Sequence, residues 1–262
     1  MPYAAFDSQR LYYRLSANDL TGRQPPLVLV HGAGGTHMHW PAHLRRLPDR
    51  NVYALDLPGH GKSAGAGCTA IAGYRDAVYG FLQALGLEQA VLVGHSMGGA
   101  ITLDFALHYP QRLAGMVLVG TGARLRVAPT ILDGLRADFA ATARTIADWV
   151  HGPRVSAQTK RLYLQRLLEA VPEVVYGDFY ACDHFDIRSD LPRIATPALV
   201  ICGTADIMTP PRYSEYLAAN LPSARLVLVP DAGHMVGLEA PEALTDAVVE
   251  FLGALQSPAV GS

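Results

Sequence analysis

The sequence predicts an α/β fold in which helices flank a mostly parallel sheet. Short apolar runs alternate with segments of helical periodicity, and this alternation is typical of parallel strands joined by helical crossovers. The chain has 262 residues, of which 50% are hydrophobic and 17% are charged, so it is long enough and apolar enough to form one large packed core.

Seven segments are expected to be strands, and the later ones are continuous apolar runs, as is typical of strands buried on both faces. The expected strands are Leu11–Arg14, Leu27–Val30, Val52–Asp56, Ala90–Val93, Met116–Val119, Leu199–Gly203 and Leu226–Val229. The expected helices are Ile71–Leu85, Met97–Tyr109, Arg212–Asn220 and Pro241–Leu255. Pro241 suits the first helical turn, where a backbone N–H is not needed.

One region breaks the alternation of strands and helices. Between Arg124 and Pro192 no strand pattern is evident, whereas apolar residues recur at helical spacing from Leu132 to Ile146 and from Leu164 to Val171. We therefore expect a helical insertion, residues 124–192, within a core domain formed by residues 1–123 and 193–262.

The run Gly94-His95-Ser96-Met97-Gly98 matches G-x-S-x-G, the nucleophile elbow. An expected strand precedes it and an expected helix follows it, which is the context that this motif requires. Small residues on both sides permit the tight turn, and the serine then stands at the positive end of the helix. The pattern predicts that Ser96 is a nucleophile. The alternative is an ordinary strand-to-helix turn with a surface serine.

A nucleophilic serine needs a base and a group that orients the base. His234 lies on a short glycine-containing loop after the last expected strand, and Asp206 lies just past the strand Leu199–Gly203. We expect His234 to be the base and Asp206 to be the acid that orients it. Asp206 could instead form an Asx turn or a helix cap. Weaker rivals for the acid are Asp183, Asp186 and Asp231.

The oxyanion hole is expected to use two backbone N–H groups. One belongs to Met97, which follows the nucleophile, and the other belongs to Ala33 in the glycine-rich loop His31–Gly35, with Gly34 as the fallback. Glycine-rich loops also bind phosphate, but this one lacks both the G-x-G-x-x-G spacing and the lysine of nucleotide-binding loops.

The chain resembles the α/β-hydrolase superfamily in the order of Ser96, Asp206 and His234, in the elbow and in the His31-Gly32 loop. The segment Asp56–Ser63 matches the loop that these proteins carry after their fourth strand. The resemblance covers about residues 25–255. It implies an eight-stranded, mostly parallel sheet with a helical cap after the sixth strand, which residues 124–192 would supply. The chain is similar to small carboxylesterases and enol-lactonase-like serine hydrolases, and the run from Ala181 to Asp186 is part of that similarity.

These residues predict a carboxylic ester hydrolase that works through an acyl-enzyme, with short- to medium-chain or aryl esters as substrates. A serine at the elbow argues against haloalkane dehalogenases and epoxide hydrolases, which have aspartate there. Enol-lactone, C–C bond or thioester hydrolysis and perhydrolysis need the same three residues and remain open. A ligand receptor with little turnover is a further alternative. The expected substrate contacts are Gly34, Trp40, Leu125, Phe139, Trp149, Met208 and Met235, and all of these except Gly34 could instead be core.

Composition limits the partners. The net charge of −2 and the lack of long basic runs argue against nucleic-acid binding. No stretch approaches the roughly 18 apolar residues of a membrane span, and no signal peptide pattern opens the chain.

The three cysteines are widely spaced, so we expect free thiols in a cytoplasmic protein. No motif calls for a cofactor, and His37-Met38-His39 lacks a nearby carboxylate or cysteine that would complete a metal site. The expected partner is a small-molecule ester. The sequence does not predict an oligomeric state.

Overall fold

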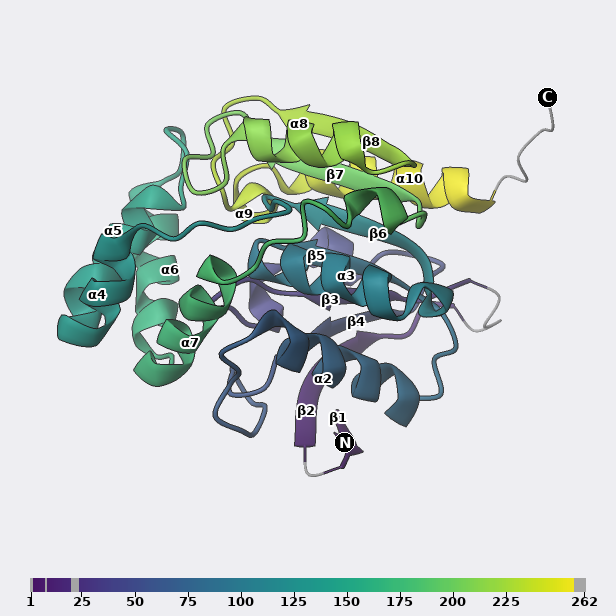
Figure 1. The fold of residues 1–262 in the computed structure, drawn as a ribbon, viewed down its shortest axis with the longest axis horizontal. Helices are drawn as coiled ribbons and strands as arrows, with labels where there is room; N and C mark the ends of the chain where they lie inside the picture. The colour runs from purple at the N-terminus through teal and green to yellow at the C-terminus, as the bar shows by residue number, and fades with distance from the viewer. Residues whose placement is uncertain (1, 8, 20–23, 257–262) are drawn as a thin grey trace.

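A computed structural model describes residues 2–7, 9–19 and 24–256. Within these residues eight strands form one sheet, in the order β1-β2-β4-β3-β5-β6-β7-β8 (Figure 1). The strands are β1 (Tyr3–Phe6), β2 (Gln9–Ser16), β3 (Leu27–Val30), β4 (Val52–Leu55), β5 (Ala90–His95), β6 (Leu113–Val119), β7 (Ala198–Gly203) and β8 (Ala224–Val229). The pairs β1–β2 and β2–β4 are antiparallel and the others are parallel, which confirms the predicted fold class.

Helices cover both faces of the sheet because side chains alternate along each strand. Val28 of β3 and Leu92 of β5 pack toward α2 (Ile71–Ala84), α3 (Met97–His108) and α8 (Pro211–Asn220). Their neighbours Leu29 and Val93 pack toward α1 (Ala42–Arg45) and α10 (Pro241–Gln256). The remaining short helices are η1 (His37–His39), η2 (Pro110–Arg112), η3 (Leu191–Arg193) and α9 (Val236–Glu239).

Strands β1, β6 and β8 differ from the sequence expectations. Strand β1 was not expected, and it pairs with β2 as an antiparallel hairpin. Strand β6 begins at Leu113, three residues before the expected start. The expectation that the last strand is buried on both faces is wrong, since the side chain of Leu228 on β8 is 38% exposed. The reason is that β8 is the edge strand of the sheet.

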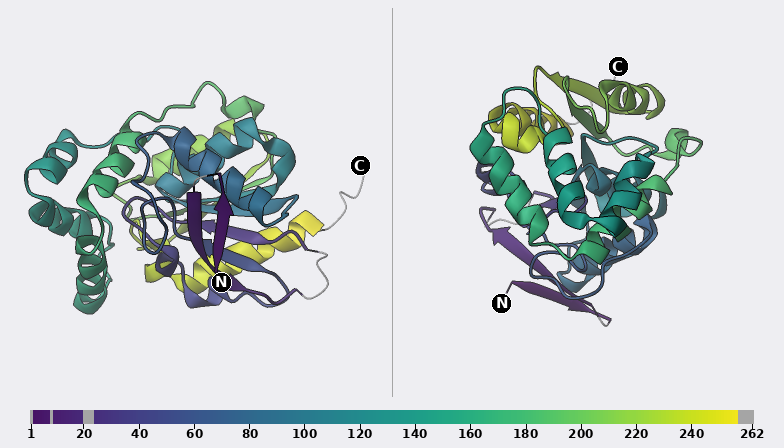
Figure 2. Two further views of the ribbon diagram at one scale, coloured as in Figure 1. Left: turned by 90° about the horizontal axis from the view of Figure 1, so that it is seen from below. Right: turned by 90° about the vertical axis from the view of Figure 1, so that its left-hand side faces the viewer.

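Four α-helices lie between β6 and β7, and we call them the inserted helices. They are α4 (Pro129–Ala137), α5 (Phe139–Trp149), α6 (Ala157–Leu168) and α7 (Pro172–Asp183). They lie together over one end of the sheet (Figures 1 and 2). The expected helical run from Leu132 to Ile146 is two helices, because Asp138 accepts a hydrogen bond from the N–H of Ala141 and starts a new one. The sequence did not indicate α7 as a helix.

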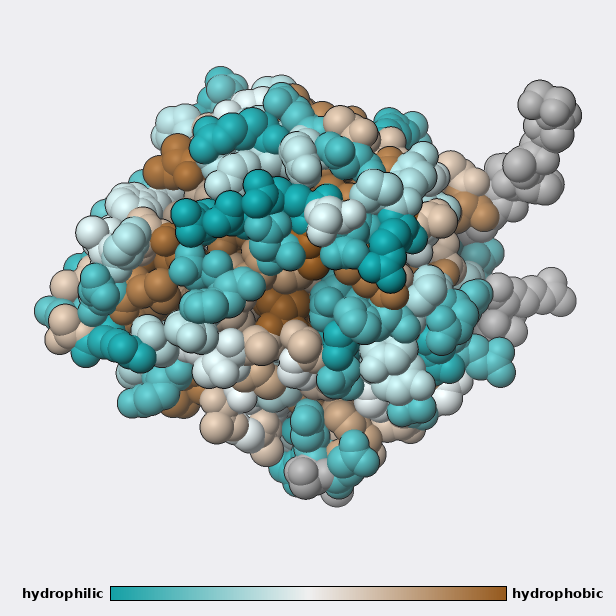
Figure 3. Space-filling view, viewed as in Figure 1, coloured by the Kyte–Doolittle hydropathy of each residue, from teal (hydrophilic) through white to brown (hydrophobic). Residues whose placement is uncertain are grey.

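The junction of the inserted helices with the sheet is apolar. Side chains of α4 to α7 form one buried cluster with Met235, which follows β8. Apolar residues are visible between polar ones along this junction (Figure 3). The loops after β3, β4, β5, β7 and β8 meet at the same edge, because the carboxyl ends of parallel strands point the same way. None of the helices in the described ranges has the length and apolar character to cross a membrane.

Candidate active site

Ser96 occupies a strained turn between β5 and α3, with φ 54° and ψ −117°. Such a backbone conformation persists in a non-glycine residue only where the surroundings impose it. Gly94 and Gly98 permit the turn. A Cβ atom on Gly98 would collide with the Val30 carbonyl, and one on Gly94 would collide with the Gly98 carbonyl. The local structure is therefore the strand, sharp turn and helix that the motif predicts.

Asp206 and His234 are hydrogen-bonded to each other. The Nδ1 atom of His234 lies 2.9 Å from Oδ2 of Asp206. The other carboxylate oxygen, Oδ1, accepts the N–H groups of Met208 at 2.8 Å and Thr209 at 2.9 Å. The hydroxyl of Thr209 donates to Oδ2 at 2.8 Å. Asp206 thus forms the Asx-type turn and also orients the imidazole, so the two roles weighed from the sequence coexist.

The electrostatics keep Asp206 ionised. Burial alone would raise the pKa of Asp206, but the charge and hydrogen bond of His234 and the hydrogen bonds of Thr209 outweigh it, so the pKa lies below its usual range. An ionised carboxylate at Nδ1 requires the proton on that nitrogen. The Nε2 atom of His234 then carries the lone pair that a general base needs.

The rival carboxylates serve elsewhere. Asp183 accepts the N–H of Val127 at 3.0 Å. Asp186 pairs with Arg124 and Arg188, and Asp231 pairs with Arg154 at 2.7 Å. Of the four acids considered from the sequence, Asp206 is the one that contacts His234.

The expected oxyanion donors, Ala33 and Met97, lie on the loop after β3 and at the start of α3. Within the described residues, neither the N–H of Ala33 nor that of Met97 donates a hydrogen bond, and Ala33 lines the pocket that also contains Ser96. The N–H of Gly34, the fallback donor, is occupied by Oδ2 of Asp178 at 2.8 Å. His31 stabilises the loop, because its Nδ1 donates a hydrogen bond to the Gly32 carbonyl at 2.8 Å.

Asp178 of α7 organises a buried polar cluster that the sequence analysis missed. Besides Gly34, its Oδ2 contacts Nε2 of His60 at 2.7 Å, and its Oδ1 accepts the hydroxyl of Tyr74 at 2.5 Å. Burial alone would lower the pKa of His60, but the charge and hydrogen bond of Asp178 raise it overall. The sequence did contain one indication of this buried acid. Asp178 follows Val174 and Val175 at helical spacing, which places a carboxylate on an apolar helix face.

We expect Asp178→Asn to lower the free energy of unfolding by about 3 kcal/mol, because it leaves the buried His60 without its charged partner. Urea unfolding followed by circular dichroism measures the change. The control is Asp133→Asn on the neighbouring helix α4, because Asp133 is exposed and the substitution should change stability little. Equal stability of the two variants would contradict this account of the cluster.

The loop that carries His234 is also fixed to the inserted helices. The Oε2 atom of Glu239 accepts the N–H groups of Gly152 and Gly233, both at 2.9 Å. The N–H of Met235 donates to the carbonyl of Val150 at 3.1 Å. The Nε2 atom of His95, next to the elbow serine, lies 3.0 Å from the His234 carbonyl.

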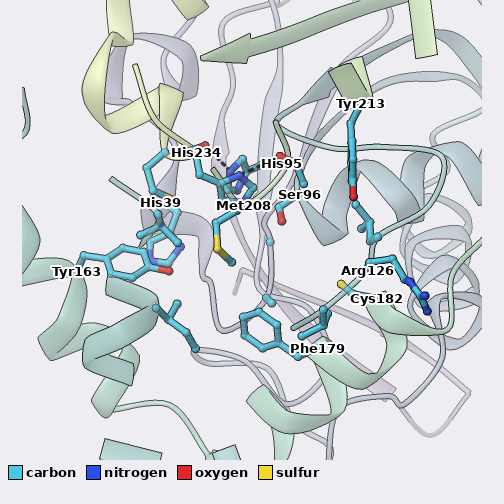
Figure 4. Close-up of a pocket in the computed structure, with 18 residues that line it drawn as sticks. His39, His95, Ser96, Arg126, Tyr163, Phe179, Cys182, Met208, Tyr213 and His234 are labelled. Carbon is cyan, nitrogen blue, oxygen red and sulfur yellow. Dashed lines mark hydrogen bonds between the residues drawn. The ribbon is translucent and has the colours of Figure 1, made fainter. Parts of the chain in front are cut away.

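A pocket opens at Ser96 and His234 (Figure 4). Three of the expected substrate contacts line it, namely Leu125, Met208 and Met235. The lining residues that were not anticipated as contacts include His39, Arg126, Tyr163, Phe179, Cys182 and Tyr213. The described residues contain no group of three or more His, Cys, Asp or Glu side chains that could hold a metal ion.

Four expected contacts lie outside this pocket. The ring of Trp40 is buried in the core under α10 and meets His95 edge-on. Phe139 and Trp149 pack within the cluster of the inserted helices. Gly34 lines a neighbouring pocket. For Trp40, Phe139 and Trp149 the structure shows the packing position that was weighed as the alternative.

Comparisons with known proteins agree with the fold. Residues 25–241 match the family model described as alpha/beta hydrolase fold. A putative carbamate hydrolase, RutD, from Caulobacter sp. (strain K31) is 31% identical, over 92% of this chain and 95% of that protein. The enol-lactonase from Burkholderia xenovorans LB400 is 27% identical, with a TM-score of 0.87 over 96% of this chain and all of that one. A thermophilic esterase from Thermogutta terrifontis is 30% identical, with a TM-score of 0.83 over 97% of this chain and 98% of that one.

Proposed function

Because the chain belongs to the alpha/beta hydrolase fold family, we propose that it is a serine hydrolase that cleaves carboxylic esters. The observation that carries the proposal is the hydrogen bond between Asp206 and His234 beside a pocket that also contains Ser96. In this proposal Ser96 is the nucleophile, His234 is the general base, and Asp206 fixes the tautomer of His234.

The reaction would proceed through an acyl-enzyme. The Ser96 oxygen attacks the ester carbonyl while Nε2 of His234 takes the hydroxyl proton. The N–H groups of Ala33 and Met97 stabilise the oxyanion. The alcohol leaves with the proton from His234. Water then attacks the acyl-enzyme, with His234 again as the base, and releases the acid and the free serine.

The inserted helices would act as the cap that selects the substrate. Ile146 of α5, Val150 just after it and Phe179 of α7 contribute apolar side chains to the pocket. Leu125 and Met235 add two more. A pocket of this kind favours short- to medium-chain or aryl acyl groups over charged substrates.

A chain-length series of p-nitrophenyl esters tests the proposal. We expect kcat/KM to peak at short or medium acyl chains, because the apolar pocket is enclosed by the inserted helices. A fluorophosphonate probe should label the protein with one equivalent. Hydrolysis that peaks only at long acyl chains would contradict the substrate class, and no turnover with any ester would contradict the reaction.

Lactone opening is the second candidate, since the similarity to the enol-lactonase covers all of that protein. The same three residues would open a cyclic ester. Lactones and enol-lactones therefore belong in the substrate panel, and a kcat/KM for a lactone well above that for every open-chain ester would favour this candidate. Thioesters in the same panel test whether the same three residues also hydrolyse a thioester.

A further inference from the structure

The hydroxyl of Tyr163, on α6, lacks a hydrogen-bond partner within the part of the chain that the structure describes. The residue is only 7% exposed, and it lines the pocket at Ser96. Its surroundings include the apolar side chains of Ile146 and Val150. Withdrawing a hydroxyl from water costs free energy unless a partner replaces the water. The hydroxyl is accessible from the pocket, so its partner is water or a ligand group that enters there.

His39 supplies a second polar group at the same place. Its ring stacks on that of Tyr163, with centroids 5.7 Å apart and an interplanar angle of 24°. Neither ring nitrogen of His39 forms a hydrogen bond to another described residue. Figure 4 shows both rings on one side of the pocket, with Arg126 and Tyr213 on the other. His39 comes from η1 and Tyr163 from α6, so two distant segments build this side of the pocket.

Both groups are uncharged near neutral pH. Burial, together with the charges of Arg166 and His60, lowers the pKa of His39 to about 4. Burial raises the pKa of Tyr163 above its usual range. Arg126, on the opposite side, is the one Lys, Arg, Asp or Glu among the described residues that line the pocket. A charged ligand group at Tyr163 would therefore be buried without a counter-charge, which is unfavourable. A neutral oxygen can satisfy both rings.

We propose that His39 and Tyr163 form a subsite for a neutral keto or hydroxyl oxygen of the substrate. This inference rests on the proposed ester hydrolysis and narrows its substrate class. The enzyme should prefer esters that carry such an oxygen at one fixed distance from the cleaved carbonyl. Plain alkyl esters of the same length would leave the buried Tyr163 and the half-buried His39 without a ligand partner. Sites built this way discriminate against substrates that lack the hydrogen-bonding group.

The test uses two sets of esters of constant length. A keto or hydroxyl group moves one carbon at a time along the acyl part in one set and along the alcohol part in the other. The readout is the ratio of kcat/KM for each oxygenated ester to kcat/KM for the matching alkyl ester. We expect a ratio of about ten or more at one position for the wild type, which corresponds to one good hydrogen bond. In Tyr163→Phe, which keeps the ring, the ratio at that position should fall to about one.

Tyr180→Phe is the matched control, because Tyr180 stacks on His184 outside the pocket and this variant should keep the wild-type ratio. Calorimetric binding of the same ester pairs to Ser96→Ala gives a second measurement that does not depend on the stability of Tyr163→Phe. A ratio near one at every position, a preference that survives in Tyr163→Phe, or a stronger preference for a carboxylate-bearing ester would each overturn the subsite. Failure of ester hydrolysis itself would show as absent turnover, while the binding preference of Ser96→Ala would still test the subsite.

Discussion

Ser96→Ala should lower kcat/KM for the best ester by about 10⁴-fold or more and abolish labelling by a fluorophosphonate probe. The expected loss is large because alanine removes the attacking oxygen, while the oxyanion donors and the binding pocket remain and support only residual catalysis. Initial-rate kinetics and intact-protein mass spectrometry measure the two effects. The backbone at position 96 should keep its strained conformation, since β5 and α3 impose it.

The matched control is Ser189→Ala, an exposed serine in the segment between α7 and η3, which should retain wild-type turnover and labelling. Persistent labelling of Ser96→Ala would place the nucleophile elsewhere. Labelling of wild-type Ser96 with only a single turnover would instead favour a receptor that retains the hydrolase geometry.

Asp206→Asn should reduce kcat by about 10⁴-fold. The carboxylate accepts the Nδ1 proton of His234, and it stabilises the imidazolium that forms as the serine loses its proton. An amide NH₂ group facing Nδ1 would favour the opposite tautomer and place the proton on Nε2, where the lone pair is needed. Steady-state kinetics on the best ester measure the loss, and circular dichroism checks that the variant is folded.

Two further variants make the assignment of the acid specific. Asp183→Asn and Asp231→Asn change carboxylates that hold Val127 and Arg154 rather than His234, so both should retain most of the wild-type kcat. If Asp206→Asn kept near-wild-type turnover while either of these lost it, the role assigned to Asp206 would pass to that residue.

The parts of the site that could be predicted from the sequence depend on local patterns. Ser96, Asp206 and His234 each follow an apolar strand, and parallel strands bring their carboxyl ends to one edge whatever the detailed packing. The Asp206–His234 contact follows from that geometry. The inserted helices were recognisable as a group because the strand pattern stops, but their boundaries were not.

The remaining features depend on contacts between distant segments. Asp178 meets a loop 144 positions away along the chain, and no local pattern encodes that pairing. Trp40 and Phe139 lie in packed clusters outside the pocket, and the sequence could not decide this, because a large apolar side chain has the same sequence signature in a core and in a pocket. Tyr163 and His39 were not anticipated at the pocket, because neither belongs to a motif and only the fold brings their rings together.

Hydrogen bonds join the inserted helices to both halves of the proposed catalytic machinery, and this restricts how such a protein can be re-engineered. Asp178 holds the loop of Ala33, and Val150 holds the loop of His234. A chimera that exchanged residues 124–192 for those of a relative would therefore change the positions of the reacting groups as well as the substrate specificity. A donor segment without a carboxylate in the place of Asp178 would leave the Gly34 amide without its acceptor. Grafts confined to the pocket-facing side chains of α5 and α6 avoid that damage.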